Sequence, residues 1–546
     1  MTAPTPASPT GIGHPLAANP SGMTDSIEVI TEPLGGSPLS VAARAGALEE
    51  FYPALPGNAT AWHRYAMEVA GSTQRDWREA LDPAFAATDA ALARLDRVRD
   101  GKGVVITTGQ QPGLFGGPLM TLVKALTARA MADELEAATG VPVAPVFWAA
   151  TDDADFEEAA VVALAVHGGA EALRHEPTGP LGIRMADMPL GADVLPLGER
   201  LRQACASAPH PAALDAALTA YRPGHTVGAA YLALLRAILE PMGIAVLDAS
   251  HPAVTARATA IMSRAAARAA SVATALSERT GAIIKRGYSP QVEEVAGLSL
   301  VFTREGGIKR RLSVAEAASA AASGELSSTV LLRPVVERCI LPTATYIGGP
   351  GEFAYFAQVS AVADALDAPS PRVMPRWSAT IVEPRISRLM HELHITRADV
   401  ASRQAEARIA ERHLPPAVSS AVQELKSALA RGAESLGAAA EGLVDRRVIV
   451  GLEAALSHRL ARGERRLLAA VKRRERADME RLGTVRGSLL PFGRRQERTL
   501  SYVPFLARYG DELVTRMIDA ARAHARGFVE GGVAADKDRP PVPQPG

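Results

Sequence analysis

Apolar runs and amphipathic stretches alternate through the first two thirds of the chain, and this alternation is typical of an α/β fold. Residues 104–106 form a short apolar run that ends in polar residues and Gly109, as a buried parallel strand does. Pro118 suits the first position of the helix that follows, in which apolar residues repeat at helical spacing. Residues 141–149 form a second apolar strand, so the unit predicts a right-handed parallel crossover.

The same pattern returns later in the chain. A helix at 229–239 leads to a strand at 244–247, and another strand at 345–347 leads into glycines. A doubly wound parallel sheet is the simplest account of these units. Between them, two short apolar segments flank Gly306 and Gly307 and predict a β-hairpin. This hairpin is interpreted as part of an insertion around 281–330.

Beyond Pro384 the composition shifts to Ala, Leu, Arg and Glu, and the apolar positions follow a heptad pattern. Two such stretches, with 445–447 as the turn, predict an antiparallel helical hairpin. The expected organisation is therefore a disordered leader (1–25), a core with a helical N-terminal segment (26–384), a coiled-coil domain (385–490), a segment that returns to the core (491–528) and a disordered tail (529–546).

Composition excludes several classes of protein. The 546 residues include 59 Lys plus Arg and 59 Asp plus Glu, so no overall field attracts nucleic acid or an anionic membrane. Two cysteines cannot form a disulfide framework or a thiolate zinc site. The N-terminus has no basic and apolar signal pattern, and no run of 18 apolar residues occurs. We therefore expect a cytoplasmic protein.

The segment 107–118 connects a strand to a helix, where free backbone N–H groups and the helix dipole favour an anion. Its glycines allow close approach of a ligand, and its glutamines can orient an amide, a sugar or a phosphate. Lys124 could reach back to this loop if the helix faces that way. The alternative is a tight connection with its glutamines in solvent. The candidate binding residues here are Thr108, Gly109, Gln110, Gln111, Gly113 and Gly117.

Acidic residues follow the second strand. Asp152, Asp153 and Asp155 would lie beside the first loop if the sheet is parallel. They could hold an amine, act as a general base or bind Mg²⁺ through oxygen ligands. The alternative is an acidic helix start, because carboxylates are favoured in a first turn.

A third polar segment follows the strand at 345–347. Its candidate residues are Gly348, Gly349, Glu352, Tyr355 and Gln358, the last three on one helix. Three polar loops that meet at one sheet edge predict a shared site, although the aromatic residues could equally belong to the core.

Familiar signatures do not occur. The chain has no Walker loop, dinucleotide fingerprint, H-x-G-H or G-x-S-x-G sequence, and His391 and His394 have the wrong spacing for a zinc protease. Residues 445–498 carry fifteen Arg plus Lys against seven Asp plus Glu. We interpret this excess mainly as the solvated face of the coiled coil, so no nucleic-acid partner is expected.

The segments 107–118, 143–158 and 331–358 resemble the cysteine ligase family of bacillithiol biosynthesis, BshC. The likeness extends over nearly the whole chain, excluding the leader and tail, and includes 287–291, 374–376, 496–498 and 505–510. It implies a Rossmann-like core and a coiled coil that pairs two subunits. The family motif T-G-Q-Q-x-G-L-F-x-G-P matches 108–118, and its E-D-H-D-F matches 152–156, with Ala154 in place of the histidine.

The resemblance implies the attachment of cysteine to the amino group of glucosaminyl-malate. It also adds Tyr288, Gln291 and Arg376 to the candidate substrate-binding residues. Amide formation needs an activated acyl group, so ATP or another nucleotide is the expected cofactor, Mg²⁺ stays open and no metal site in the protein is expected. One of the three aspartates would take a proton from the amine. Two alternatives remain: an RNA-binding protein like a class I synthetase or nucleotidyltransferase, and a noncatalytic dimeric scaffold.

Overall fold

The computed structural model describes residues 26–321, 326–402 and 404–531, so the expected leader and nearly all of the expected tail lie outside it. The chain forms two compact units. Val29–Ile381 and the segment from Gly483 onward form the larger unit, and Val382–Leu482 make up most of the other. Each unit is described separately below.

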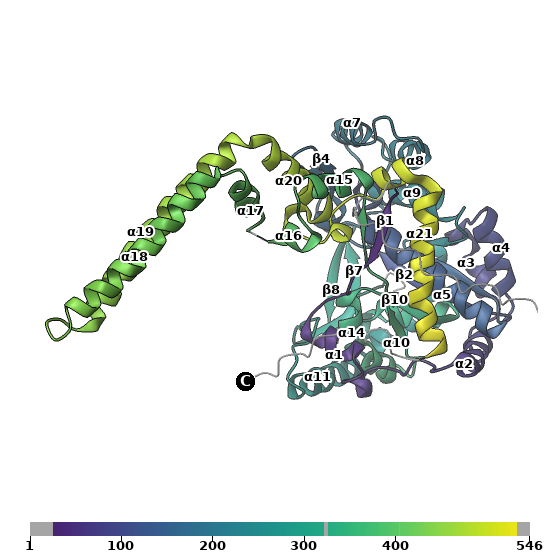
Figure 1. The fold of residues 1–546 in the computed structure, drawn as a ribbon. Coiled ribbons are helices and arrows are strands. Elements are labelled where there is room, and N and C mark those ends of the chain that lie inside the picture. Colours follow the sequence, from purple (N-terminus) through teal and green to yellow (C-terminus); the bar gives the residue numbers. More distant parts are fainter. Residues whose placement is uncertain (1–25, 322–325, 403, 532–546) are drawn as a thin grey trace, which may run out of the picture. The chain divides into compact units, whose positions relative to one another are not determined.

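The larger unit is built on one sheet of five parallel strands (Figure 1). In spatial order they are β11 (Val373–Pro375), β10 (Thr343–Gly348), β2 (Val104–Gln110), β3 (Val143–Ala149) and β6 (Ala245–Asp248). This order confirms the predicted doubly wound sheet. The chain proceeds from β2 to β3 and β6 on one side, whereas β10 and β11 lie on the other side. The switch point between β2 and β10 is where such sheets bind ligands.

Burial explains why these segments form strands. Every residue of β3 and β10, and all of β2 except Gln110, is buried, as expected of central parallel strands covered on both faces. The helix α5 (Leu119–Thr139) connects β2 to β3, and α14 (Pro350–Ala365) follows β10. Pro118 occupies the N-cap position of α5 and not the predicted first helical position.

The N-terminal helical segment and the hairpin insertion also occur as predicted. The hairpin pairs β7 (Leu298–Glu305) with β8 (Ile308–Ser313), and β9 (Ser327–Ser328) adds a third strand. Helix α21 (Val503–Glu530) packs along α5 (Figure 1). The remaining elements of this unit are β1 (Glu28–Thr31), α1 (Pro38–Arg44), α2 (Ala59–Ser72), α3 (Trp77–Phe85), α4 (Asp89–Val98), α6 (Phe156–Ala159), β4 (Val161–Val166), β5 (Gly169–Arg174), α7 (Val194–Ala204), α8 (Ala212–Ala220), α9 (Val227–Leu239), α10 (Pro252–Ala267), α11 (Ala269–Lys285), α12 (Val314–Ala320), α13 (Arg333–Ile340) and β12 (Ala379–Val382).

The other unit contains the predicted helical hairpin. Helices α18 (Pro416–Ala439) and α19 (Arg446–Arg474) pair in opposite directions, with an ion pair of 2.8 Å between Lys426 and Glu464. The turn lies earlier than predicted, because Asp445 caps α19 through its side chain. Shorter helices precede the pair: α15 (Pro384–Glu392), α16 (Arg397–Ala401) and α17 (Ala405–Arg412). Helix α20 (Arg476–Leu489) follows the pair, and its residues from Gly483 belong to the larger unit. No helix in the described part of the chain is both long and apolar enough to cross a membrane.

Candidate active site

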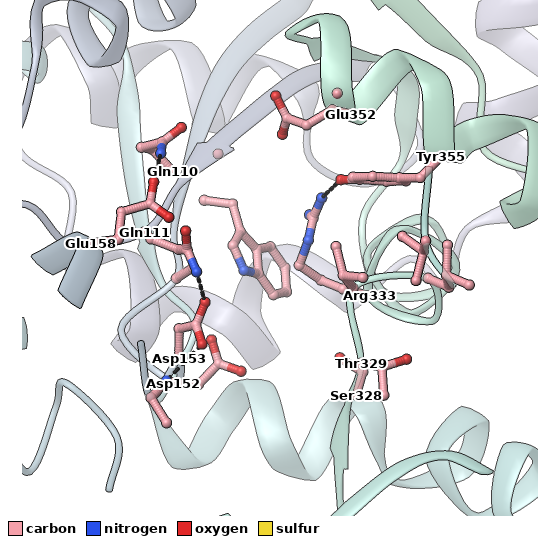
Figure 2. Close-up of a pocket in the computed structure, with 18 of the residues that line it drawn as sticks. Gln110, Gln111, Asp152, Asp153, Glu158, Ser328, Thr329, Arg333, Glu352 and Tyr355 are labelled. Carbon is pink, nitrogen blue, oxygen red and sulfur yellow. Dashed lines mark hydrogen bonds between the residues drawn. The ribbon is translucent and has the colours of Figure 1, made fainter. Parts of the chain in front are cut away.

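A cavity of about 730 Å³ lies at the switch point of the sheet. Pockets of this size commonly hold metabolites and cofactors. Carboxylates and glutamines occupy one side of it, and Arg333 with Tyr355 faces them from the other side (Figure 2). Its polar lining residues are Gln110, Gln111, Asp152, Asp153, Glu158, Lys309, Arg311, Ser328, Thr329, Arg333, Tyr346, Glu352, Tyr355 and Arg498.

The loop after β2 is held in place by a buried tyrosine. The hydroxyl of Tyr221 donates to the carbonyl of Gly113 at 2.7 Å and accepts from the N–H of Gly116 at 3.1 Å. Gly116 has a φ of +86°, and a Cβ there would lie 2.0 Å from the hydroxyl of Tyr502. Glycine is therefore required at this position by the fold of the protein itself.

Part of the expected anion cradle in this loop is already occupied by protein atoms. The N–H of Leu119, at the start of α5, donates to the carbonyl of Leu500 at 2.7 Å, and the N–H of Gly117 donates to that of Leu114 at 3.0 Å. A Cβ on Gly113 would collide with Gly117, so these glycines pack against each other. The prediction of free N–H groups is wrong at Gly116, Gly117 and Leu119, because protein atoms already use them.

The acidic segment after β3 divides into two roles. Asp152 and Asp153 line the cavity, Gln111 donates to Asp153, and Asp152 lies 3.9 Å from the Nζ of Lys309. Asp155 instead caps the short helix α6, where its Oδ1 accepts from the N–H of Glu158 at 3.2 Å. The acidic helix start that the sequence left open as an alternative therefore describes Asp155.

Lys124 connects the two loops that flank the switch point. It projects from α5 and is 1% exposed, and its Nζ donates to the carbonyl of Gly109, to Gln110 and, at 2.7 Å, to Glu352. Burial lowers the pKa of Lys124, although Glu352 opposes this. Burial raises the pKa of Glu352, but Lys124, Tyr346 and the N–H of Gly349 together hold the pKa below its ordinary value.

A second buried network supports Arg333. Its guanidinium donates to Glu337 at 2.9 Å and to the hydroxyl of Tyr355 at 3.4 Å, and it lies 5.0 Å from the ring centre of Tyr346. Glu337 also accepts from the hydroxyl of Thr107. Burial raises the pKa of Glu337 despite Arg333. The network holds the guanidinium of Arg333 at the cavity wall.

The residues singled out from the sequence separate into two groups. Gly109, Gln110, Gln111, Asp152, Asp153, Gly349, Glu352 and Tyr355 line the cavity. Other candidates lie outside its lining, and their role in binding stays a prediction: Thr108, Gly113, Gly117, Asp155, Tyr288, Gln291, Gly348, Gln358 and Arg376.

Several of this second group have partners in the fold. Thr108 donates to the carbonyl of Ile347 at 2.9 Å, within the sheet. Gln358 exchanges hydrogen bonds with the backbone of Val292. Arg376 makes a buried ion pair with Glu497 at 2.6 Å.

Sequence reasoning missed most of the cationic side of the cavity. Lys309 and Arg311 come from β8, Arg333 from α13 and Arg498 from the C-terminal segment. No shared motif links these positions in the sequence, so only the fold brings them together.

Two buried polar groups in the lining have no hydrogen-bond partner within the described part of the chain. They are the indole N–H of Trp148, which is 4% exposed, and the hydroxyl of Thr329, which is 8% exposed. A buried polar group without a partner is costly, so both point to a polar ligand or ordered water in the cavity. In the same described segments, no three His, Cys, Asp or Glu residues gather as a metal site would require.

Comparison with known proteins agrees with this architecture. Residues 42–377 match the family model described as "Bacillithiol biosynthesis BshC, N-terminal Rossmann-like domain", and residues 379–529 match the corresponding C-terminal coiled-coil domain. A protein of Koribacter versatilis named "Putative cysteine ligase BshC" is 31% identical, over 88% of this chain and 94% of its own length. The proteins of that name from Solibacter usitatus and Geobacillus thermodenitrificans are 30% and 28% identical, over 86% and 81% of this chain and 92% and 86% of their own lengths.

Proposed function

Because the chain belongs to the BshC family of bacillithiol biosynthesis, we propose that it joins L-cysteine to the amino group of glucosaminyl-malate by an amide bond. The observation that carries this proposal is the cavity at the switch point, which has carboxylates on one side and cations on the other. Its volume of about 730 Å³ suits a substrate of this size.

The charges of the cavity complement those of glucosaminyl-malate. This molecule carries an amine on the sugar and two carboxylates on the malate. The amine matches Asp152 and Asp153, and the carboxylates match Arg333, which faces the aspartates, and Arg311 of the same lining. Complementary charges at both ends would orient the amine toward the acyl donor.

Amide formation requires that the carboxylate of cysteine be activated first. ATP or another nucleotide is the proposed source, which would leave an acyl phosphate or acyl adenylate. The N–H groups of Gly116, Gly117 and Leu119, in the loop after β2, do not fit the phosphates of such a molecule, because they are already bonded. No step below therefore depends on a nucleotide bound there, and a role for Mg²⁺ stays a proposal.

The carboxylates of the acidic segment have a defined task in this reaction. The substrate amine is an ammonium ion at neutral pH and must lose a proton before its lone pair can attack the acyl carbon. We assign the binding of the ammonium and this first proton transfer to Asp152 and Asp153. Gln111 would keep Asp153 in place through its hydrogen bond.

We further propose that the enzyme acts in the cytoplasm as a homodimer. The substrate thiol is stable in a reducing compartment, and the coiled coil offers an apolar surface on α18 and α19.

A direct assay tests the proposed activity. Purified protein is incubated with cysteine, glucosaminyl-malate and ATP, and the products are identified by mass spectrometry. We expect the cysteinyl amide to appear, and to fall at least tenfold in Asp152→Asn and Asp153→Asn.

Glu157→Gln is the matched control for these variants, because Glu157 is exposed and pairs with Arg174 on the surface. Product that forms equally without ATP would remove the nucleotide from the proposal. Wild-type protein that forms no amide with any activator, while its loss from cells leaves bacillithiol unchanged, would contradict the proposed activity. A noncatalytic scaffold predicts instead that Asp152→Asn leaves cellular bacillithiol unchanged.

A further inference from the structure

Glu158 is a cavity residue to which the steps above give no task. It lies on α6 and lines the cavity together with Asp152 and Asp153 (Figure 2). Its Oε1 accepts a hydrogen bond of 3.0 Å from the side-chain N–H of Gln110. Its Oε2 has no hydrogen-bond partner among the residues that the structure describes, so this oxygen can still accept a proton.

The orientation of Gln110 follows from Lys124. A lysine ammonium only donates hydrogen bonds, so the atom of Gln110 that faces it at 3.3 Å must be the amide oxygen. The amide N–H₂ then faces Glu158, and the reverse orientation would place two donors against each other. Lys124 is itself fixed by the carbonyl of Gly109 and by Glu352.

The reaction also requires a second proton acceptor. An ammonium that becomes an amide nitrogen loses two protons, one before attack and one as the amide forms. The first is assigned above to the aspartates. Asp153 is less suited to take the second, because its Oδ1 accepts from the N–H of Ala154 at 2.6 Å and its Oδ2 accepts from Gln111.

We propose that Glu158 accepts the second proton from the substrate nitrogen, and that Lys124, acting through Gln110, is the positioning residue that holds it for this task. In this step the new C–N bond is already formed and the bond to the activating group breaks, so that its electron pair leaves with that group. One N–H bond breaks, its electron pair stays on nitrogen, and the proton goes to Oε2 of Glu158. The acyl phosphate or acyl adenylate is the only co-reactant.

The surroundings of Glu158 favour this role. The side chain of Glu158 is partly open to solvent, but partial desolvation by the cavity still raises its pKa. Asp155 and Asp153 raise the pKa further, whereas Lys124 lowers it and Glu352 raises it. These charged groups come from the acidic segment, from α5 and from α14. A carboxylate with a raised pKa is a better proton acceptor than an ordinary one near neutral pH.

The inference rests on the proposed function, and the test begins with pH profiles of amide formation. We expect Glu158→Gln to lower kcat roughly 100-fold or more, with KM within about threefold, because only the proton transfer is lost. Glu157→Gln, at the neighbouring position, should retain wild-type kcat, because Glu157 pairs with Arg174 and does not line the cavity. A Glu158→Gln protein within threefold of wild-type kcat would overturn the assignment.

Gln110→Glu tests the positioning of Glu158 without removing a buried charge. The new carboxylate keeps an acceptor for Lys124 but repels Glu158, so the pKa of Glu158 rises. The acidic limb of the kcat/KM profile should therefore move to higher pH. A limb that stays at its wild-type position would overturn the link between Gln110 and Glu158. If Lys124→Met folds, it should lower kcat by a larger factor than it raises KM. If Lys124→Met does not fold, the pH profile of Gln110→Glu alone decides whether Glu158 is positioned through Gln110.

A measurement without substrate separates this inference from the proposed function. Because the pKa of Glu158 is raised above 4.5 in the folded protein, folded protein holds this proton more tightly than unfolded protein does. Stability relative to Glu158→Gln should fall as pH rises from 4.5 through the folded pKa. The same stability difference can be measured between Gln110→Glu and Gln110→Glu/Glu158→Gln. In this second pair the fall should extend to higher pH than in the first pair. If the wild type is inactive but both pH effects on stability are seen, only the proposed function is contradicted. If the wild type is active and neither pH effect is seen, only this inference is contradicted.

Discussion

Arg376, a candidate substrate-binding residue in the sequence, takes part in a buried ion pair in the structure. It is 1% exposed and makes two hydrogen bonds to Glu497, at 2.8 and 2.6 Å. Glu497 also accepts from Ser378 and from the N–H of Ala379. Burial raises the pKa of Glu497, but Arg376, Ser378 and the N–H of Ala379 together hold the pKa below its ordinary value. The pair ties the end of β11 to the C-terminal segment.

Removing one partner of this pair should destabilise the fold. We expect Arg376→Met to lower the free energy of unfolding by about 3–5 kcal/mol, because Glu497 would remain as a buried, uncompensated charge. Denaturant unfolding measures the loss. The double variant Arg376→Met/Glu497→Leu should regain part of it, since no charge is then left unpaired. Unchanged stability with a raised KM would instead support the earlier prediction that Arg376 binds substrate.

The loop between β2 and α5 shows how a whole element is held for the site. Its central turn has three positive φ angles in succession, 49° at Phe115, 86° at Gly116 and 81° at Gly117. Tyr221, from the end of α8, closes this turn with its hydroxyl. The loop is therefore positioned by side chains behind the cavity, and Gln110 and Gln111 are left to face the cavity itself.

Tyr221→Phe tests this arrangement. The substitution removes both hydrogen bonds of this hydroxyl, whereas the N–H of Gly116 keeps its bond of 2.9 Å to the carbonyl of Gly113. We therefore expect a loss of about 0.5–1.5 kcal/mol in unfolding free energy. Tyr502→Phe is the matched control, because the Tyr502 hydroxyl is buried and has no hydrogen-bond partner within the described residues. It should cost little or nothing. Equal losses in both variants would show that the hydroxyl of Tyr221 has no special role.

Elements with a strong local pattern could be predicted from the sequence, and the cavity only in part. The runs that became β2 and β3 were recognisable because both faces of a central strand are buried, and the hairpin was recognisable by Gly306 and Gly307. Glycines were harder to interpret, because the packing of Tyr502 is enough to require a glycine at Gly116. Lys124 faces the site only because of how α5 packs, which periodicity cannot reveal.

At the scale of the whole molecule, the helical hairpin carries an unusual amount of exposed apolar surface. Neither α18 nor α19 contains a buried residue in the single chain. Leu425, Leu436, Leu452, Leu456 and Leu467 are all more than 40% exposed. Exposed heptad leucines of this kind are typical of a surface that pairs with another coiled coil.

A charge on this surface should prevent dimer formation. We expect Leu436→Glu/Leu456→Glu to shift the molar mass in light scattering from two chains to one, because a carboxylate at an apolar contact must be desolvated without a partner. Deletion of 416–482 should have the same effect. Gln423→Glu, on the exposed polar face of α18, is the control and should remain dimeric. A wild-type protein of one chain would contradict the proposed homodimer.

The hydrogen bond between the N–H of Leu119 and the carbonyl of Leu500 has a consequence for folding during synthesis. A ribosome makes β2 and the start of α5 early, yet the group that closes this loop comes almost four hundred residues later, together with Arg498 of the cavity wall. Domains generally fold as they emerge during synthesis. The nascent chain can therefore form the sheet but cannot complete the cavity until translation is nearly finished, so incomplete chains released early should lack the finished site.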